Sequence, residues 1–126
     1  MKNSLTSDLG LLLIRITGAG LILTHGIPKL RRLFAEGPIE FGDPIGIGPA
    51  ASLFLAVFAE FLCAVLVLLG FKTRWATIPI IITMLVAAFI VHAADPLGTK
   101  EKALLFLGIF VSIFLLGPGK YSIDRK

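Results

Sequence analysis

Charged residues are scarce in this chain. Of its 126 residues, 16% are charged and 56% are hydrophobic. A soluble domain of this length needs a far more polar surface, so the composition argues against a water-soluble globular protein. Cysteine is almost absent: Cys63 is single and lies in an apolar segment, which excludes an internal disulfide and a CxxC redox centre. We interpret Cys63 as a small packing residue.

Sequence motifs for a flavin, a haem or a dinucleotide are also missing. A contiguous basic arm is missing too, because the net charge of +4 comes from residues at the ends of apolar segments. Charges placed there suit phospholipid head groups, and we do not expect binding to nucleic acid. Membrane lipids are therefore the first partners that the sequence predicts.

Long apolar runs dominate what is present. A helix that crosses about 30 Å of hydrocarbon needs about 20 residues, and three of the four runs reach that length. The sequence predicts an all-α polytopic membrane protein, with one domain over residues 1–126 folded as an antiparallel four-helix transmembrane bundle. The predicted helices span about 8–27, 51–70, 75–94 and 102–117, and the last needs tilt to cross. The long first loop, 28–50, is apolar and is expected to pack on the bundle mouth.

The first apolar run is expected to be retained, because basic residues follow it where a secretory signal has a small-residue cleavage site. Four spanning helices place both termini on one side of the membrane. The side of the termini carries six lysines and arginines: Lys2, Lys72, Arg74, Lys120, Arg125 and Lys126. The other side carries five: Lys29, Arg31, Arg32, Lys100 and Lys102. The positive-inside rule therefore predicts cytoplasmic termini in a bacterial plasma (inner) membrane.

Apart from the threonines, the polar residues of the first predicted helix share one face. At about 100° per residue, they fall within a sector about 100° wide, which is typical of a helix whose stripe faces a protein interior or a cavity. Arg15 could instead snorkel to the head groups. The residues of this stripe are Asp8, Arg15, Gly18, Ile22, His25, Gly26 and Lys29.

Glu60 lies about ten residues from either end of the second apolar run, too deep to snorkel. An ionised carboxylate at that depth needs a partner, or it stays protonated. If the helices run antiparallel, Arg15 lies within about 6 Å of Glu60 in depth. The sequence therefore predicts an Arg15–Glu60 pair, either as a structural clasp or as part of a site.

Other polar residues are expected to meet at one mouth of the bundle. The end of the first helix, the end of the third and the start of the fourth fall on the same side of the membrane. They carry His25, Lys29, His92, Asp95, Glu101 and Lys102. Interfacial placement by chance is the alternative, because helix ends are where charged residues normally lie.

These residues resemble a known family. Arg15, Gly20, His25, Gly26, Lys29 and Leu30 are similar to the opening signature of the DoxX family of small four-helix membrane proteins, which includes subunits of thiosulfate:quinone oxidoreductases. A glutamate before a Gly-Phe-Lys-Thr-Arg turn and the closing "GPGKYSIDRK" resemble later parts of the pattern. The resemblance implies a membrane-associated oxidoreductase system and points to Arg15, His25, Lys29 and Glu60.

Three classes of function fit. The first is a membrane-embedded subunit of a quinone-linked oxidoreductase, with a polar pocket for a quinone-like ligand and electrons from a partner oxidoreductase subunit. Its candidates for ligand binding or proton relay are Arg15, His25, Lys29, Glu60, His92 and Glu101. The second is a non-catalytic subunit that assembles or anchors a partner enzyme. The third is a small transporter or metal site.

Metal and haem are weakly supported. His25 and His92 are the candidate ligands, yet no HxxxH or ExxH spacing occurs, and a b-type haem between them is the least favoured reading. We assign no catalytic residue and no cofactor beyond a quinone. An open bundle of this kind also suits a homodimer.

Overall fold

The computed structural model describes residues 5–35, 37, 39, 43 and 45–124, and these contain helices and no strand. Lys2, Arg125 and Lys126, used above to predict orientation, lie outside the described residues. The first helix, α1 (Leu5–Leu33), is followed by α2 (Pro49–Val57), which continues through the π-helix η1 (Phe58–Cys63) into α3 (Ala64–Leu69). The next, α4 (Thr73–Val86), continues into a second π-helix, η2 (Ala87–Val91), and α5 (Leu97–Leu116) follows.

Helix α1 is longer than the sequence predicted. It ends at Leu33, six residues beyond the expected end at 27, and it contains Pro28 in its interior. Proline removes one backbone hydrogen bond from a helix, but the turns on either side can continue when they are packed. As a result, Lys29 belongs to the helix and lies on its buried side.

Three helical stretches are long and apolar enough to cross a membrane: Leu5–Leu33, Pro49–Leu69 and Thr73–Val91. Helix α5 has 20 residues, but charged residues at positions 100–102 occupy its first turns, and it is not among the three. The prediction of an all-helical fold is therefore confirmed for the described residues. Length and composition support three membrane-spanning helices among them.

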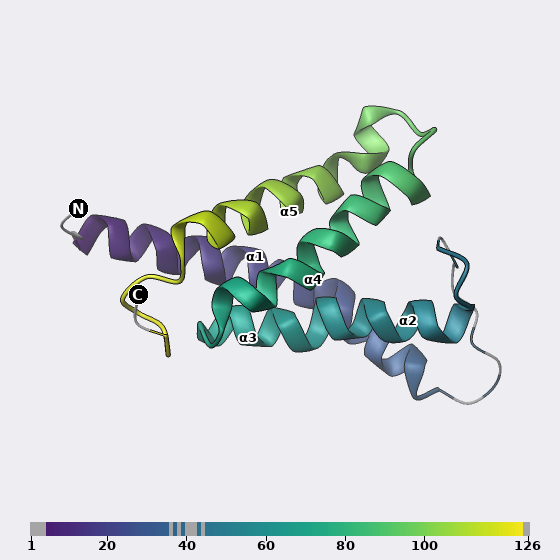
Figure 1. The fold of residues 1–126 in the computed structure, drawn as a ribbon, viewed down its shortest axis with the longest axis horizontal. Helices are drawn as coiled ribbons and strands as arrows, with labels where there is room; N and C mark the ends of the chain where they lie inside the picture. Colours follow the sequence, from purple (N-terminus) through teal and green to yellow (C-terminus); the bar gives the residue numbers. More distant parts are fainter. Residues whose placement is uncertain (1–4, 36, 38, 40–42, 44, 125–126) are drawn as a thin grey trace.

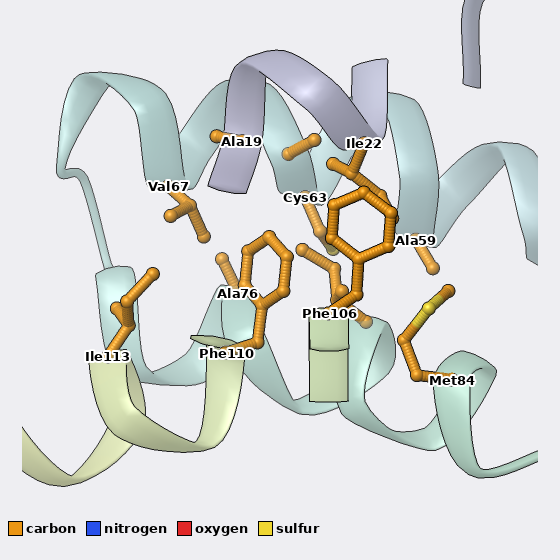
Figure 2. Packing of buried hydrophobic residues seen from close by; sticks show 12 residues of the cluster. Ala19, Ile22, Ala59, Cys63, Val67, Ala76, Met84, Phe106, Phe110 and Ile113 are labelled. Atoms are coloured by element: carbon orange, nitrogen blue, oxygen red, sulfur yellow. The ribbon is translucent and has the colours of Figure 1, made fainter. Parts of the chain in front are cut away.

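The helices lie against one another (Figure 1), and their buried side chains form one apolar core. Small side chains on α1, η1 and α4 let the backbones approach, as Ala19, Ala59 and Ala76 do in Figure 2. Phe106 and Phe110 of α5 fill the space between them (Figure 2), and Phe110 is fully buried. Cys63 lies in this core at 2% exposure, where it packs as a small residue.

The outer surface carries large apolar side chains such as Leu13, Phe54, Trp75 and Leu115, each more than half exposed. Contiguous apolar surface of this kind is a liability in water and suits contact with lipid chains.

Candidate functional site

An ion pair between α1 and η1 forms the centre of the candidate site. The Nζ atom of Lys29 lies 2.8 Å from Oε1 and 2.6 Å from Oε2 of Glu60. The Glu60 side chain is only 3% exposed, whereas that of Lys29 is 28% exposed. Both oxygens of this buried carboxylate thus accept hydrogen bonds from a cation, which is the pairing that a buried charged group needs.

Local backbone features bring the two residues together. Gly26, one turn before Lys29, packs so closely on η1 that a Cβ atom there would collide with the Glu60 carbonyl oxygen. Glu60 itself lies in a π-helix, whose extra residue per turn changes the direction in which the following side chains point. Such π-helical segments occur frequently at functional sites.

The predicted Arg15–Glu60 pair is wrong. Arg15 is 2% exposed, and its guanidinium donates only to backbone carbonyls in the described residues. Two of these, of Val67 at 3.0 Å and Leu68 at 2.9 Å, belong to the last turn of α3. The carbonyls of a last helical turn carry the negative end of the helix dipole and have spare capacity to accept hydrogen bonds, so they are favourable partners for a buried guanidinium.

The same guanidinium fixes the segment after α5. Its Nη1 atom donates to the carbonyls of Pro118 at 3.0 Å and Tyr121 at 2.9 Å. Farther along, the Asp124 carboxylate accepts hydrogen bonds from the backbone N–H groups of Lys72 and Thr73, both at 2.9 Å, and so caps the start of α4. Arg15 therefore has a structural role at the end of the molecule away from Glu60.

Two cavities open beside the Lys29–Glu60 pair. The large cavity, of about 310 Å³, lies between the continuous helix formed by α2 and η1 and the continuous helix formed by α4 and η2. Most of its lining is apolar, with Leu55, Ile82 and Val86 among the side chains, and its polar lining residues are Lys29, Ser52, Glu60, Thr83 and His92. The small cavity, of about 150 Å³, lies on the other side, between α1, η2 and α5, and is also lined by Lys29, Glu60 and His92.

His92 reaches both cavities, and its orientation is fixed. Its Nδ1 atom lies 2.8 Å from Oδ2 of Asp95. A carboxylate on one ring nitrogen orients the imidazole and leaves Nε2 as the nitrogen that can meet a ligand. The predicted association of His92 with Asp95 at the mouth is thus present in the structure.

The remaining predicted residues are divided between the two sides. His25 lines only the small cavity, where its ring meets the edge of Phe106 at 6.0 Å between centroids. Lys102 and Thr99 line the small cavity as well. Glu101 is exposed and lines neither cavity, so the structure does not place it with the other candidates.

Asp43 and Ser52 are polar residues that the sequence analysis did not single out. The Asp43 carboxylate accepts hydrogen bonds from the backbone N–H groups of Ile47 at 2.9 Å and Gly48 at 2.8 Å, and from the Ser52 hydroxyl at 3.0 Å. Desolvation raises the pKa of Asp43, but these hydrogen bonds outweigh it and hold the pKa below its ordinary value of 3.8. Asp43 thereby fixes the start of α2 beside the large cavity.

In the part of the chain that the structure describes, no group of three or more His, Cys, Asp or Glu side chains is placed to hold a metal ion. What the arrangement offers is a mostly apolar cavity whose lining includes an ammonium group, an oriented imidazole and a buried carboxylate. Such groups can donate hydrogen bonds to carbonyl oxygens and can exchange protons with a bound ring.

Comparisons with known proteins agree with this architecture. The sequence matches the DoxX family model over residues 10–93. An uncharacterized membrane protein of Mycobacterium tuberculosis, Rv3486, is 35% identical over 90% of this chain and 78% of its own length. The inner membrane proteins YqjF and YphA of Escherichia coli are 31% and 29% identical, over 94% and 92% of this chain and over 92% and 89% of their own lengths. No solved structure matches the chain.

Proposed function

The chain belongs to the DoxX family of membrane proteins, and from this premise we propose that it is the membrane-embedded subunit of a quinone-linked oxidoreductase. In this proposal the large cavity holds the ring of a quinone-like ligand. The observation that carries the proposal is the large cavity itself, whose lining is mostly apolar and includes Lys29, Glu60 and His92.

The size and lining of the large cavity suit such a ring. Its volume of about 310 Å³ is at the lower end of the range for small-molecule sites, about 300–1,000 Å³. That volume accommodates an aromatic head group but not a long isoprenoid tail. The tail leaves past Leu55, Ile82 and Val86 into the surrounding lipid.

The polar end matches the two carbonyl oxygens of a quinone. The Lys29 ammonium donates to one oxygen and stabilises negative charge as it develops. The His92 imidazole, in its protonated form, donates from Nε2, with Asp95 holding Nδ1 at 2.8 Å. Glu60 exchanges protons with the cavity when its contact with Lys29 loosens. Reduction of the ring to the quinol takes two electrons and two protons, and the electrons come from a partner oxidoreductase subunit.

We also propose an arrangement in the membrane. We place α5 as the fourth spanning helix of an antiparallel bundle in a bacterial inner membrane, with cytoplasmic termini. The charged start of α5 and the end of η2 then lie at the opposite, periplasmic surface. Reporter fusions after the last residue test this orientation. If the C-terminus is cytoplasmic, a reporter that is active only in the periplasm must be inactive when fused to it.

Binding of a short-chain, water-soluble quinone to the purified protein tests the function. We expect His92→Ala and Glu60→Gln to weaken binding about tenfold each, because a hydrogen bond from or to a charged group is worth about 1.5–3 kcal/mol. His25→Ala is the matched control, since His25 lines only the small cavity. Size-exclusion profiles and circular dichroism establish that the variants are folded.

Unchanged dissociation constants in both large-cavity variants would contradict the assignment of the ligand to the large cavity. Absence of quinone binding by the wild-type protein would contradict the oxidoreductase function itself. The chain would then be better explained as an assembly subunit for a partner enzyme.

A further inference from the structure

The small cavity has a chemistry of its own. It lies between the last third of α1, the segment that carries Met84, Ala87 and His92, and the first turns of α5, and it has a volume of about 150 Å³. That is the volume of about five water molecules at roughly 30 Å³ each, enough for a phosphate or another compact polar group. Ile22, Met84 and Phe106 form its apolar floor.

Three hydrogen-bond donors face this cavity without protein partners. Among the described residues, no hydrogen bond or ion pair engages the Lys102 ammonium, the ring nitrogens of His25 or the Thr99 hydroxyl. All three residues line the small cavity, and none of them lines the large cavity. The edge-to-face contact with Phe106, at 84° between planes, holds the His25 ring in place.

Positive charge predominates around these donors. Glu60 is the carboxylate among the residues that line the small cavity, and both of its oxygens are held by Lys29. Lys102, Glu60 and Lys29 all lie close enough to His25 for their charges to act on its imidazole, the carboxylate in the opposite sense to the two lysines. An anion entering the small cavity therefore meets cations and neutral donors, and the carboxylate it approaches is already neutralised.

We propose that the small cavity binds the phosphate group of an anionic phospholipid. Thr99 and Lys102 lie in the first turns of α5 and His92 lies just after η2, so this part of the cavity is at helix ends, which is the level of lipid head groups in a spanning protein. The two elements that contribute to this part of the cavity also carry exposed apolar side chains, Phe89 and Ile90 on η2 and Leu97 and Leu105 on α5, each more than half exposed. They offer a surface for the acyl chains, while Lys102, His25 and Thr99 hold the phosphate.

The two cavities share Lys29, Glu60 and His92, but Lys102 and Thr99 line only the small cavity, so variants at these two positions test the phosphate site separately from the proposed quinone site. Native mass spectrometry of the intact, delipidated protein tests it, with phosphatidylglycerol added in one series and phosphatidylcholine of the same chains in another. We expect retained phosphatidylglycerol adducts in the wild-type protein and an affinity about tenfold lower in Lys102→Gln. Thr99→Val removes one neutral donor and is expected to lower the affinity less.

The matched control is Lys120→Gln, since Lys120 is an exposed lysine beyond α5 that lines neither cavity. It should leave the phosphatidylglycerol affinity unchanged. Inorganic phosphate at the lipid concentration should displace no lipid, because it lacks the acyl chains. The proposal is overturned if phosphatidylcholine is retained as strongly, if Lys102→Gln matches Lys120→Gln, or if inorganic phosphate displaces the lipid.

Discussion

Replacing Lys29 with methionine leaves the Glu60 carboxylate without its ion-pair partner in a site where only 3% of that side chain is exposed. Breaking a buried pair by removing one member costs about 3–5 kcal/mol, since an uncompensated charge stays buried. The Lys29 side chain is 28% exposed, so water offsets part of this cost and we expect the lower end, about 3 kcal/mol. That corresponds to a loss of roughly a hundredfold in the ratio of folded to unfolded protein.

Reversible unfolding by sodium dodecyl sulfate in mixed micelles measures this loss. The double variant Lys29→Met, Glu60→Met has no buried charge at this point and should recover most of the stability, as apolar replacement of buried pairs does elsewhere. Lys102→Met is the control, because Lys102 has no carboxylate partner among the described residues and should change stability by less than about 0.5 kcal/mol. The reasoning would be refuted if Lys29→Met were as stable as the wild-type protein, or if the double variant were less stable than Lys29→Met.

Three further predictions concern the rest of the fold. Arg15→Lys keeps the charge, but a lysine cannot reproduce the four hydrogen bonds that the planar guanidinium donates to backbone carbonyls. We therefore expect the free energy of unfolding to fall by about 2–4 kcal/mol in the same assay. Equal stability would contradict the structural role of Arg15. Gly26→Ala should lower the free energy of unfolding by about 1–3 kcal/mol, because the added Cβ meets the Glu60 carbonyl oxygen. Gly10→Ala is the control: an added Cβ there has no atom within 4 Å, so the variant should be neutral or slightly stabilising. Equal effects of the two substitutions would contradict the close packing at Gly26. Hydrogen bonds to Asp43 lower its folded-state pKa, so their contribution is present above the ordinary value of 3.8 and is lost as pH falls through the folded value. The stability difference between wild type and Asp43→Asn should therefore shrink below about pH 4 in a pH series of unfolding curves, and a difference that persists to lower pH would contradict it.

The buried face of α1 could be predicted from the sequence. The helical period placed Asp8, Arg15, Gly18, Ile22 and Gly26 on one stripe, and all five are buried. A periodic pattern is informative here because lipid and protein interior favour different residues on opposite faces of one helix.

The pairing of charges could not be predicted, because it depends on how far one helix slides along another. Gly26 packs directly against Glu60. Arg15 is eleven residues before Gly26, which puts it about 16 Å from Gly26 along the helix axis. That distance places Arg15 at the end of α3, where it donates to Val67. Aligning helix ends predicted from apolar runs misses this register when α1 continues past Pro28.

Two other features had no recognisable signal in the sequence. The π-helices η1 and η2 adjoin both cavities, yet their residues look like ordinary apolar helix. Asp124 caps α4 from 51 residues away along the chain, a contact that depends on the fold and not on local spacing. The candidate site was therefore predicted by residue type, while its partners and its two cavities required the structure.

Photoaffinity labelling with an azido-quinone in inner-membrane vesicles tests the central claim most directly. The large cavity predicts labels on the segments that carry Leu55, Ile82 and Val86, read by peptide mass spectrometry, and protection by excess unlabelled quinone. It also predicts weaker labelling in Glu60→Gln and unchanged labelling in His25→Ala. Labels confined to α5 or to the outer faces of the helices, or labels that excess quinone does not reduce, would contradict a quinone site at the Lys29–Glu60 pair.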